Sequence, residues 1–227
     1  MAYYTNRNGS SFFSNVPTVT RTLLVINIIM FVATLINEDF MIEKFALFYP
    51  TSYFFRWWQP LSHMFMHGGF WHIFFNMYTL LMFGSIIERT IGEKKFLILY
   101  FVCGFGAVLL HLGVQYLQIQ NWMAAATPAA QINITNLLRT PTVGASGAIY
   151  GLLIAFAMLN PDAVLTLIFP PIPLKAKWWV IIFAAIELLT GMTGTVGGVA
   201  HFAHLGGILF GFLLILYWRK KGTLWKR

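Results

Sequence analysis

Charged side chains are scarce in this sequence. Asp, Glu, Lys and Arg together make up 10% of its 227 residues, whereas hydrophobic residues make up 58%. A soluble domain usually carries about 25% charged residues, so this chain has too little polar surface to cover a water-soluble globule. Its apolar side chains must face lipid instead, and we expect an integral membrane protein whose main partner is the bilayer.

Acidic residues are particularly rare, with 7 Asp and Glu against 15 Lys and Arg and a net charge of +8. The basic residues are scattered between apolar runs and form no patch, and no nucleic-acid-binding motif is present. We therefore expect no nucleic-acid partner. The basic residues are better interpreted as signals of membrane topology.

Cysteine is nearly absent. The single residue, Cys103, excludes an intramolecular disulfide, and its apolar neighbours are typical of a small buried side chain. The N-terminal stretch resembles neither a cleavable signal peptide nor an Arg-rich transit peptide. These features favour the cell (inner) membrane of a prokaryote.

Six apolar segments have lengths at or near what a bilayer crossing requires. They run over about Val19–Ile36, Gly69–Ile87, Lys95–Tyr116, Gly144–Asn160, Trp178–Gly191 and Ala200–Trp218. The fourth and fifth are short, which is tolerated where protein surrounds a helix. The sequence thus predicts an all-α membrane protein of six transmembrane helices at 19–218, with a short tail at 1–18 and a basic tail at 219–227.

The distribution of Lys and Arg predicts the orientation of these segments. If the N-terminus is cytoplasmic, 12 of the 15 basic residues lie at or beyond the cytoplasmic ends of the segments. The exceptions are Lys44, Arg56 and Arg139. The positive-inside rule then places both termini in the cytoplasm, in agreement with an even number of spans. Two long connections lie outside. Asn37–Gly68 is expected in the interface, and Gln118–Val143 is expected to be an exposed, mobile loop.

Polar side chains inside the apolar segments mark a candidate site, because such groups are costly in lipid. The second segment contains His72 and Asn76 on one helix face, and the fourth opens with Ser146, with Tyr150 one turn later. The sixth contains His204. All three segments start on the outer side, so these residues lie at a similar shallow depth and can share one cavity that is open to water.

A serine hydroxyl becomes a strong nucleophile when a base such as histidine takes its proton. Ser146 and His204 are the candidates for this pair. His72, Asn76 and the backbone N–H of Ser146 are the candidates for stabilising an oxyanion. No Asp or Glu lies near these residues along the chain, which predicts a dyad with no third member. The chemistry requires neither a metal nor a cofactor.

Glycines suggest how the serine and the histidine meet. Gly144 and Gly147 flank the serine, and Gly147 lies four residues before Gly151 on the fourth segment. Gly207 and Gly211 have the same spacing on the sixth. Small residues four apart let membrane helices approach closely, so we expect these two faces to pack together.

Other interpretations remain open. His63, His67 and His72 could ligate a metal, although His63-x-x-x-His67 lacks the glutamate of a zinc-peptidase helix. Glu187, the only carboxylate deep in a span, could serve an ion-coupled transporter, or it could be a neutral group bonded to another helix. A non-proteolytic protein that binds client helices would have no need of Ser146.

Three motifs occur in a fixed order along the chain. They are His67…His72-x-x-x-Asn76, Gly144-Ala145-Ser146-Gly147 with Tyr150, and Ala203-His204-x-x-Gly207-x-x-x-Gly211. In these motifs the chain resembles the rhomboid family of intramembrane serine proteases, over about Val19–Trp218. The resemblance implies a six-helix bundle in which Ser146 is the nucleophile and His204 the base. It also implies that Tyr150 stacks beneath His204.

The resemblance further implies an endopeptidase that cuts single-span membrane proteins near the outer face. In such a protein the first long connection forms a membrane-embedded hairpin, and the fifth helix with Gly191–Gly198 gates substrate access. The chain departs from the family at Trp58-Gln59, where Trp-Arg is frequent. Gln59 keeps hydrogen-bond donors but lacks the charge, which puts this loop anchor in question.

Overall fold

The structure is a computed structural model that describes residues 15–166, 171–192 and 198–224. It is mostly helical. In chain order, the helices are α1 (Thr18–Ile36), α2 (Glu38–Phe45), α3 (Gln59–Ser62), the 3₁₀ turn η2 (His63–Phe65), α4 (Phe70–Thr79), the π-helical turn η3 (Leu80–Gly84), α5 (Ser85–Ile91), α6 (Glu93–Ala125), α7 (Pro128–Arg139), α8 (Ser146–Leu159), α9 (Ala176–Met192) and α10 (Gly198–Lys220).

Within the described residues, four helical stretches are long and apolar enough to cross a membrane. They are Thr18–Ile36, Phe70–Ile91, Glu93–Ala125 and Ala200–Lys220. The second is continuous through α4, η3 and α5. α8 is apolar but has only 14 residues, and α9 has 17, so neither reaches the length of a full span. The chain is thus a multi-pass membrane protein, and the count of six spans stays a prediction.

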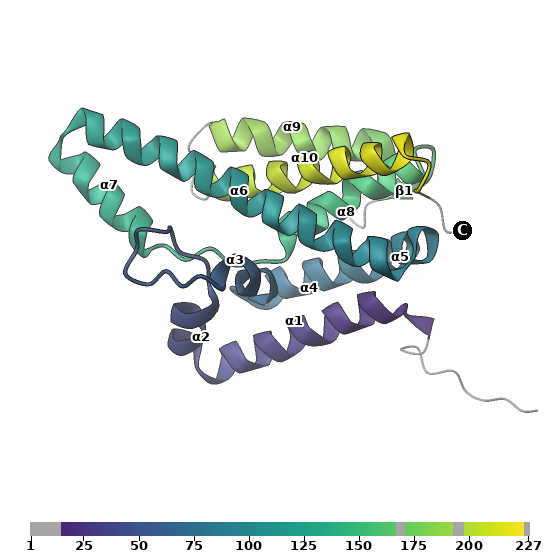
Figure 1. Ribbon diagram of the computed structural model, residues 1–227, viewed down its shortest axis with the longest axis horizontal. Helices are drawn as coiled ribbons and strands as arrows, with labels where there is room; N and C mark the ends of the chain where they lie inside the picture. The colour runs from purple at the N-terminus through teal and green to yellow at the C-terminus, as the bar shows by residue number, and fades with distance from the viewer. Residues whose placement is uncertain (1–14, 167–170, 193–197, 225–227) are drawn as a thin grey trace, which may run out of the picture.

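α8 lies at the centre of the bundle. It packs against α6 and α10 and also touches α4 and α9. Figure 1 shows α4, α8 and α10 all starting at the left-hand end of the bundle, where α2, α3 and α7 also lie. The described start of α1 and the end of α10 lie at the opposite end. The topology therefore gathers the first residues of α4, α8 and α10 at one end.

Glycines set the spacing between α8 and α10. A Cβ added to Gly211 would lie 2.8 Å from the carbonyl oxygen of Gly151, and one added to Gly151 would lie 2.9 Å from that of Gly207. A Cβ on Gly207 would overlap the carbonyl oxygen of Gly147. The backbones of the two helices are thus in direct contact, which only residues without a side chain permit.

Two elements differ from the sequence prediction. Gln118–Val143 is largely exposed, as expected, but the interpretation of this stretch as a loop was wrong, because α6 continues to Ala125 and α7 follows. This stretch is rich in Ala, a strong helix former, and the Thr127 side chain caps α7 by accepting from the Ala130 N–H at 3.1 Å. The all-α prediction also missed a small antiparallel pair, β1 (Val164–Thr166) and β2 (Pro173–Lys175).

Candidate active site

Ser146 is the first residue of α8, at the end of the bundle where α4 and α10 also begin. The backbone turns into this helix at Gly144, whose φ of +137° is a conformation that favours glycine. The Gly144 N–H donates to the His63 carbonyl at 3.0 Å, which ties the turn to the first long connection. The first N–H groups of a helix have no intrahelical acceptor, so those of Ser146 and Gly147 can donate to a ligand.

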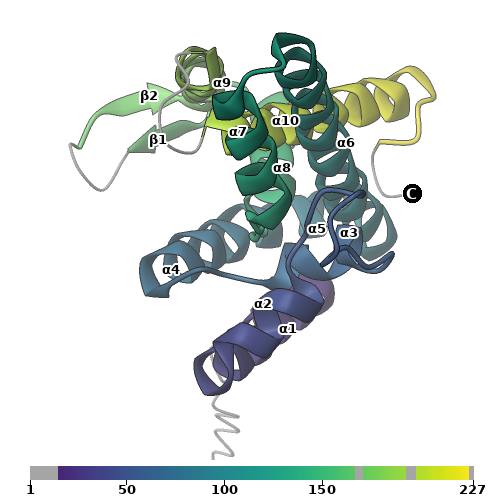
Figure 2. The ribbon, with the colours of Figure 1, turned by 90° about the vertical axis from the view of Figure 1, so that its left-hand side faces the viewer.

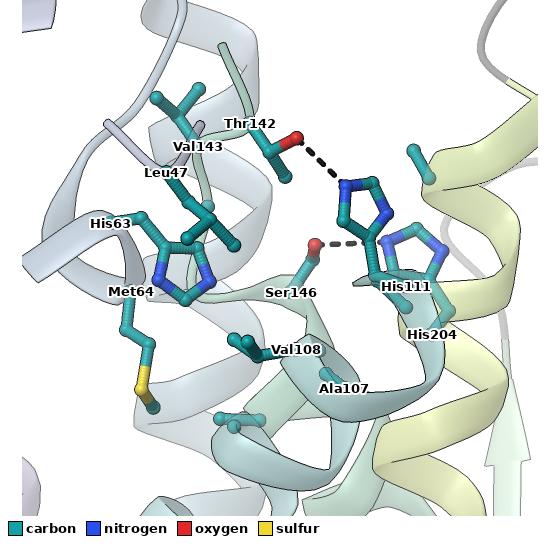
Figure 3. A pocket seen from close by; sticks show the side chains of 16 residues that line it. Leu47, His63, Met64, Ala107, Val108, His111, Thr142, Val143, Ser146 and His204 are labelled. Atoms are coloured by element: carbon teal, nitrogen blue, oxygen red, sulfur yellow. Dashed lines mark hydrogen bonds between the residues drawn. The ribbon is translucent and has the colours of Figure 1, made fainter. Parts of the chain in front are cut away.

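His204 reaches the serine from α10. Its Nε2 lies 2.8 Å from Ser146 Oγ, the distance of a good hydrogen bond (Figure 3). The two residues are 58 positions apart in the chain, and the glycine contacts between α8 and α10 bring them together. With Nε2 as the acceptor, the arrangement is that of a hydroxyl whose proton a base can remove.

Tyr150 stacks against the imidazole of His204. Its ring stacks on that of His204 with 4.3 Å between centroids and 9° between planes. Its hydroxyl donates to Glu187 Oε1 at 2.5 Å. Tyr150 lies four residues after Ser146, so one face of α8 presents both the hydroxyl and the aromatic support.

Glu187 of α9 also lies at this site, which the sequence analysis did not predict, although one of its interpretations was a carboxyl group bonded to another helix. Its buried carboxylate lies 2.5 Å from His201 Nδ1 and 3.0 Å from His204 Nδ1. No acceptor among the described residues lies in line with the His204 Nδ1–H direction, so the 3.0 Å contact is an electrostatic pair and not an aligned hydrogen bond. The dyad stays a prediction, and the structure adds that a third ionisable group lies beside the histidine.

Glu187, His201 and His204 also form a group that could hold a metal ion. The ligand atoms of Glu187, His201 and His204 lie within 4.8 Å of one another. A metal bound at Nδ1 of a neutral His204 would leave the proton on Nε2, and that nitrogen could then not accept from Ser146. Metal binding here and base catalysis by His204 are thus mutually exclusive.

His72 and Asn76 come from α4. A Cβ built on Gly144 would lie 3.0 Å from His72 Nε2 and 3.4 Å from Ser146 Oγ, so both groups lie against this glycine. His72 Nδ1 accepts from the Gly68 N–H at 3.4 Å, which leaves Nε2 as the donor in a neutral ring. Asn76 is buried, and its Nδ2 has no partner in the described part of the chain. Both side chains therefore offer donors.

Two cavities lie near the candidate site. A small one of about 40 Å³ lies beside Ser146 and His204 and is also lined by His63, His111 and Thr142 (Figure 3). It has room for a few water molecules. A larger, mostly apolar cavity of about 570 Å³ lies between α4 and α9 and is lined by Asn76 and Tyr150 among others. Figure 2 shows α4 and the β1–β2 hairpin on the same side of the molecule.

The first long connection is anchored at the position where the sequence departs from the rhomboid pattern. The Gln59 amide donates to the carbonyls of Glu43 at 3.2 Å and Phe54 at 2.9 Å, and its oxygen accepts from the Phe48 N–H at 3.3 Å. The Gln59 carbonyl in turn lies 3.0 Å from His63 Nδ1. A neutral side chain thus holds this loop together without the charge of an arginine.

The comparison with protein families matches the Rhomboid domain to residues 55–221, which is well over half of the chain. The chain belongs to the rhomboid family. The matched region contains every residue assigned above to the candidate site of this rhomboid, from His63 on the first connection to Gly211 on α10. α1 lies outside it.

Relatives of this rhomboid occur in several kingdoms. Rhomboid protease AarA of Providencia stuartii is 30% identical over 210 residues, which cover 86% of this chain and 70% of that protein. RHOMBOID-like protein 4 of Arabidopsis thaliana is 32% identical over 157 residues, or 69% of this chain and 33% of its own length. Rhomboid protein 1, mitochondrial, of Saccharomyces cerevisiae is 27% identical over 180 residues, or 79% of this chain and 43% of its own. The chain spans less than half of the latter two.

Proposed function

We propose that this chain is an active intramembrane serine endopeptidase that hydrolyses peptide bonds of single-span membrane proteins. The observation that carries the proposal is the 2.8 Å contact between Ser146 Oγ and His204 Nε2 at the start of a buried helix. Membership of the rhomboid family and the likeness to a protein named a rhomboid protease support it.

The proposed reaction begins when Nε2 of His204 takes the proton of Ser146 as Oγ attacks the substrate carbonyl carbon. The carbonyl electron pair moves to oxygen and gives a tetrahedral oxyanion. As this intermediate collapses, the C–N bond breaks and the proton passes from Nε2 to the leaving amine. Water then attacks the acyl-enzyme with the same histidine as base, and the small cavity beside Ser146 supplies a place for that water.

The oxyanion requires preorganised donors. We assign this role to the backbone N–H of Ser146, to Nε2 of His72 and to Nδ2 of Asn76. The start of α8 adds a positive dipole end at the same place. Burial strengthens each of these interactions, because little water competes for the developing charge.

A substrate helix would approach the serine through the apolar cavity between α4 and α9, whose volume of about 570 Å³ and mostly apolar lining suit aliphatic side chains. A helical backbone shields its carbonyls, so the substrate must unwind near the cut. Substrates should therefore carry Gly, Pro or small residues at that point. We assign the gating of access to α9 and the segment after it, of which residues 193–197 lie outside the described part of the chain.

We further propose six membrane crossings at 19–218, with the tails at 1–18 and 219–227 in the cytoplasm and the active site near the outer face. The gathering of the first residues of α4, α8 and α10 at one end of the bundle supports this arrangement. The similarity to a bacterial relative over most of the chain supports a prokaryotic cell membrane.

The proposal is tested by labelling with a fluorophosphonate in detergent, together with cleavage of a single-span model substrate that carries Gly and Ala near its outer end. Wild type should label and cleave, whereas Ser146→Ala and His204→Ala should do neither. Cleavage that survives in Ser146→Ala would overturn the serine mechanism. Binding of the substrate without cleavage by any variant, wild type included, would instead favour the non-proteolytic client-binding protein.

A further inference from the structure

Glu187 brings a carboxylate into the centre of an apolar bundle. Its side chain is 8% exposed, and α9 carries it to a position where it faces α8 and α10. Taking a carboxylate out of water is strongly unfavourable unless hydrogen bonds and charges compensate. The contacts of this side chain therefore indicate why it is tolerated.

Among the described residues, this carboxylate contacts Tyr150, His201 and His204. Oε2 pairs with His201 Nδ1 at 2.5 Å. Oε1 accepts from the Tyr150 hydroxyl at 2.5 Å and lies 3.0 Å from His204 Nδ1. Since Tyr150 also stacks on the imidazole, Glu187 acts on His204 both directly and through the aromatic ring beneath it.

The position of the carboxylate determines which nitrogen of His204 carries the proton. A neutral imidazole has one N–H, and the base reaction needs Nε2 free to accept from Ser146. A negative oxygen at 3.0 Å from Nδ1 favours the proton at that nitrogen. After Nε2 has taken the serine proton the ring is positive, and the same oxygen stabilises that charge while gaining no proton itself.

We propose that Glu187 is a positioning residue that acts on the Ser146–His204 pair through His204. Its carboxylate holds the Nδ1–H form of His204 and stabilises the ring once it is protonated. This inference rests on the proposed function. It adds to it a charge requirement on α9, outside the three sequence motifs.

Two pairs of variants separate charge from packing. Glu and Gln have the same size, as do Asp and Asn, and within each pair the amide removes the negative charge and replaces one acceptor oxygen by an NH2 donor. We would measure the second-order rate of fluorophosphonate labelling for wild type, Glu187→Gln, Glu187→Asp and Glu187→Asn, with thermal unfolding of each. Glu93→Gln, at the exposed start of α6, is the control for loss of one negative charge from the chain.

If the charge acts on His204, each carboxylate should label at least tenfold faster than its amide. In steady-state cleavage of the model substrate, Glu187→Gln should lower kcat and leave KM unchanged. Because the comparison is made twice, at two side-chain lengths, the Asp and Asn variants decide the matter if Glu187→Gln does not fold. Glu93→Gln should behave as wild type.

Equal rates within both pairs would overturn the inference, since the role of Glu187 would then be packing. That result would leave the proposed function intact, provided that wild type labels and Ser146→Ala does not. If wild type labels no faster than Ser146→Ala, the proposed function fails and this inference fails with it.

Discussion

The ring of Tyr150 lies almost parallel to that of His204, 4.3 Å away, while its hydroxyl holds Glu187. Tyr150→Leu removes the aromatic surface that fixes the imidazole opposite Ser146. We expect fluorophosphonate labelling to slow by about tenfold to a hundredfold, because small displacements of a catalytic group cost this much. Tyr150→Phe keeps the ring and should lose less. Identical rates for the Leu and Phe variants would show that stacking contributes nothing.

The contact between α8 and α10 predicts a steric requirement at Gly207. In Gly207→Ala the new methyl group would overlap the carbonyl oxygen of Gly147, so the helices must separate. We expect a loss of about 1–3 kcal/mol in stability and slower labelling of Ser146. Thermal unfolding and labelling rate measure the two effects. The matched control is Gly113→Ala on α6, where an added Cβ meets nothing within 4 Å and both values should stay at the wild-type level.

Gln59 makes three hydrogen bonds to the backbone of the first long connection. Gln59→Ala leaves these buried backbone groups without their hydrogen-bond partner. We expect the free energy of unfolding to fall by about 2–4 kcal/mol. The unfolding temperature should fall, and proteolysis between residues 43 and 60 should be faster at room temperature. Gln131→Ala, on the exposed face of α7, is the control. Equal unfolding temperatures for the two variants would contradict the anchoring role.

Two histidines of the same connection predict sensitivity to acid. Burial lowers the pKa of His63 from 6.5 to about 4 and the pKa of His67 from 6.5 to about 3. The unfolded chain therefore binds protons first as the pH falls below about 6.5, and stability declines from there down to the folded pKa values. At pH 5 each histidine should lower the free energy of unfolding by roughly 2 kcal/mol relative to neutral pH.

The measurement is the unfolding temperature at pH 7.5 and pH 5.0. His67→Phe retains an aromatic ring against His72 and removes one of the two titrating groups. Its unfolding temperature should fall less between these pH values than that of wild type. An equal or larger fall in the variant would show that His67 does not titrate in this range.

Hydropathy predicted much of the fold. The expected segment Val19–Ile36 differs from α1 by one residue, and the helices α8, α9 and α10 each end within two residues of their predicted segments. Uninterrupted apolar runs between polar residues leave little freedom in these boundaries. The errors lie where the pattern is weak. The Ala-rich stretch before α7 was judged by its polarity and not by its helix propensity, and the strands β1 and β2 are three residues each.

The candidate site was predictable in part. Depth and orientation brought Ser146 and His204 together, because both stand at the start of segments that begin on one side. The same argument does not single out Glu187, although this residue lies five positions before the end of α9 and so at the end of the bundle where α10 begins. Its contact with His204 depends on how far α9 is rotated about its own axis, and hydropathy gives no information on that angle for a helix so apolar all round.

The chain order of these residues has a consequence for biogenesis. Ser146 is on α8, Glu187 on α9 and His204 on α10, the last of the described helices. During synthesis the serine therefore enters the membrane well before its base. On the proposed function, a nascent chain that has not yet inserted α10 cannot attack the membrane proteins around the translocation machinery. On the same proposal, proteolytic activity should begin only once α10 is in place, and a chain that ends before Gly198 should not react with a fluorophosphonate.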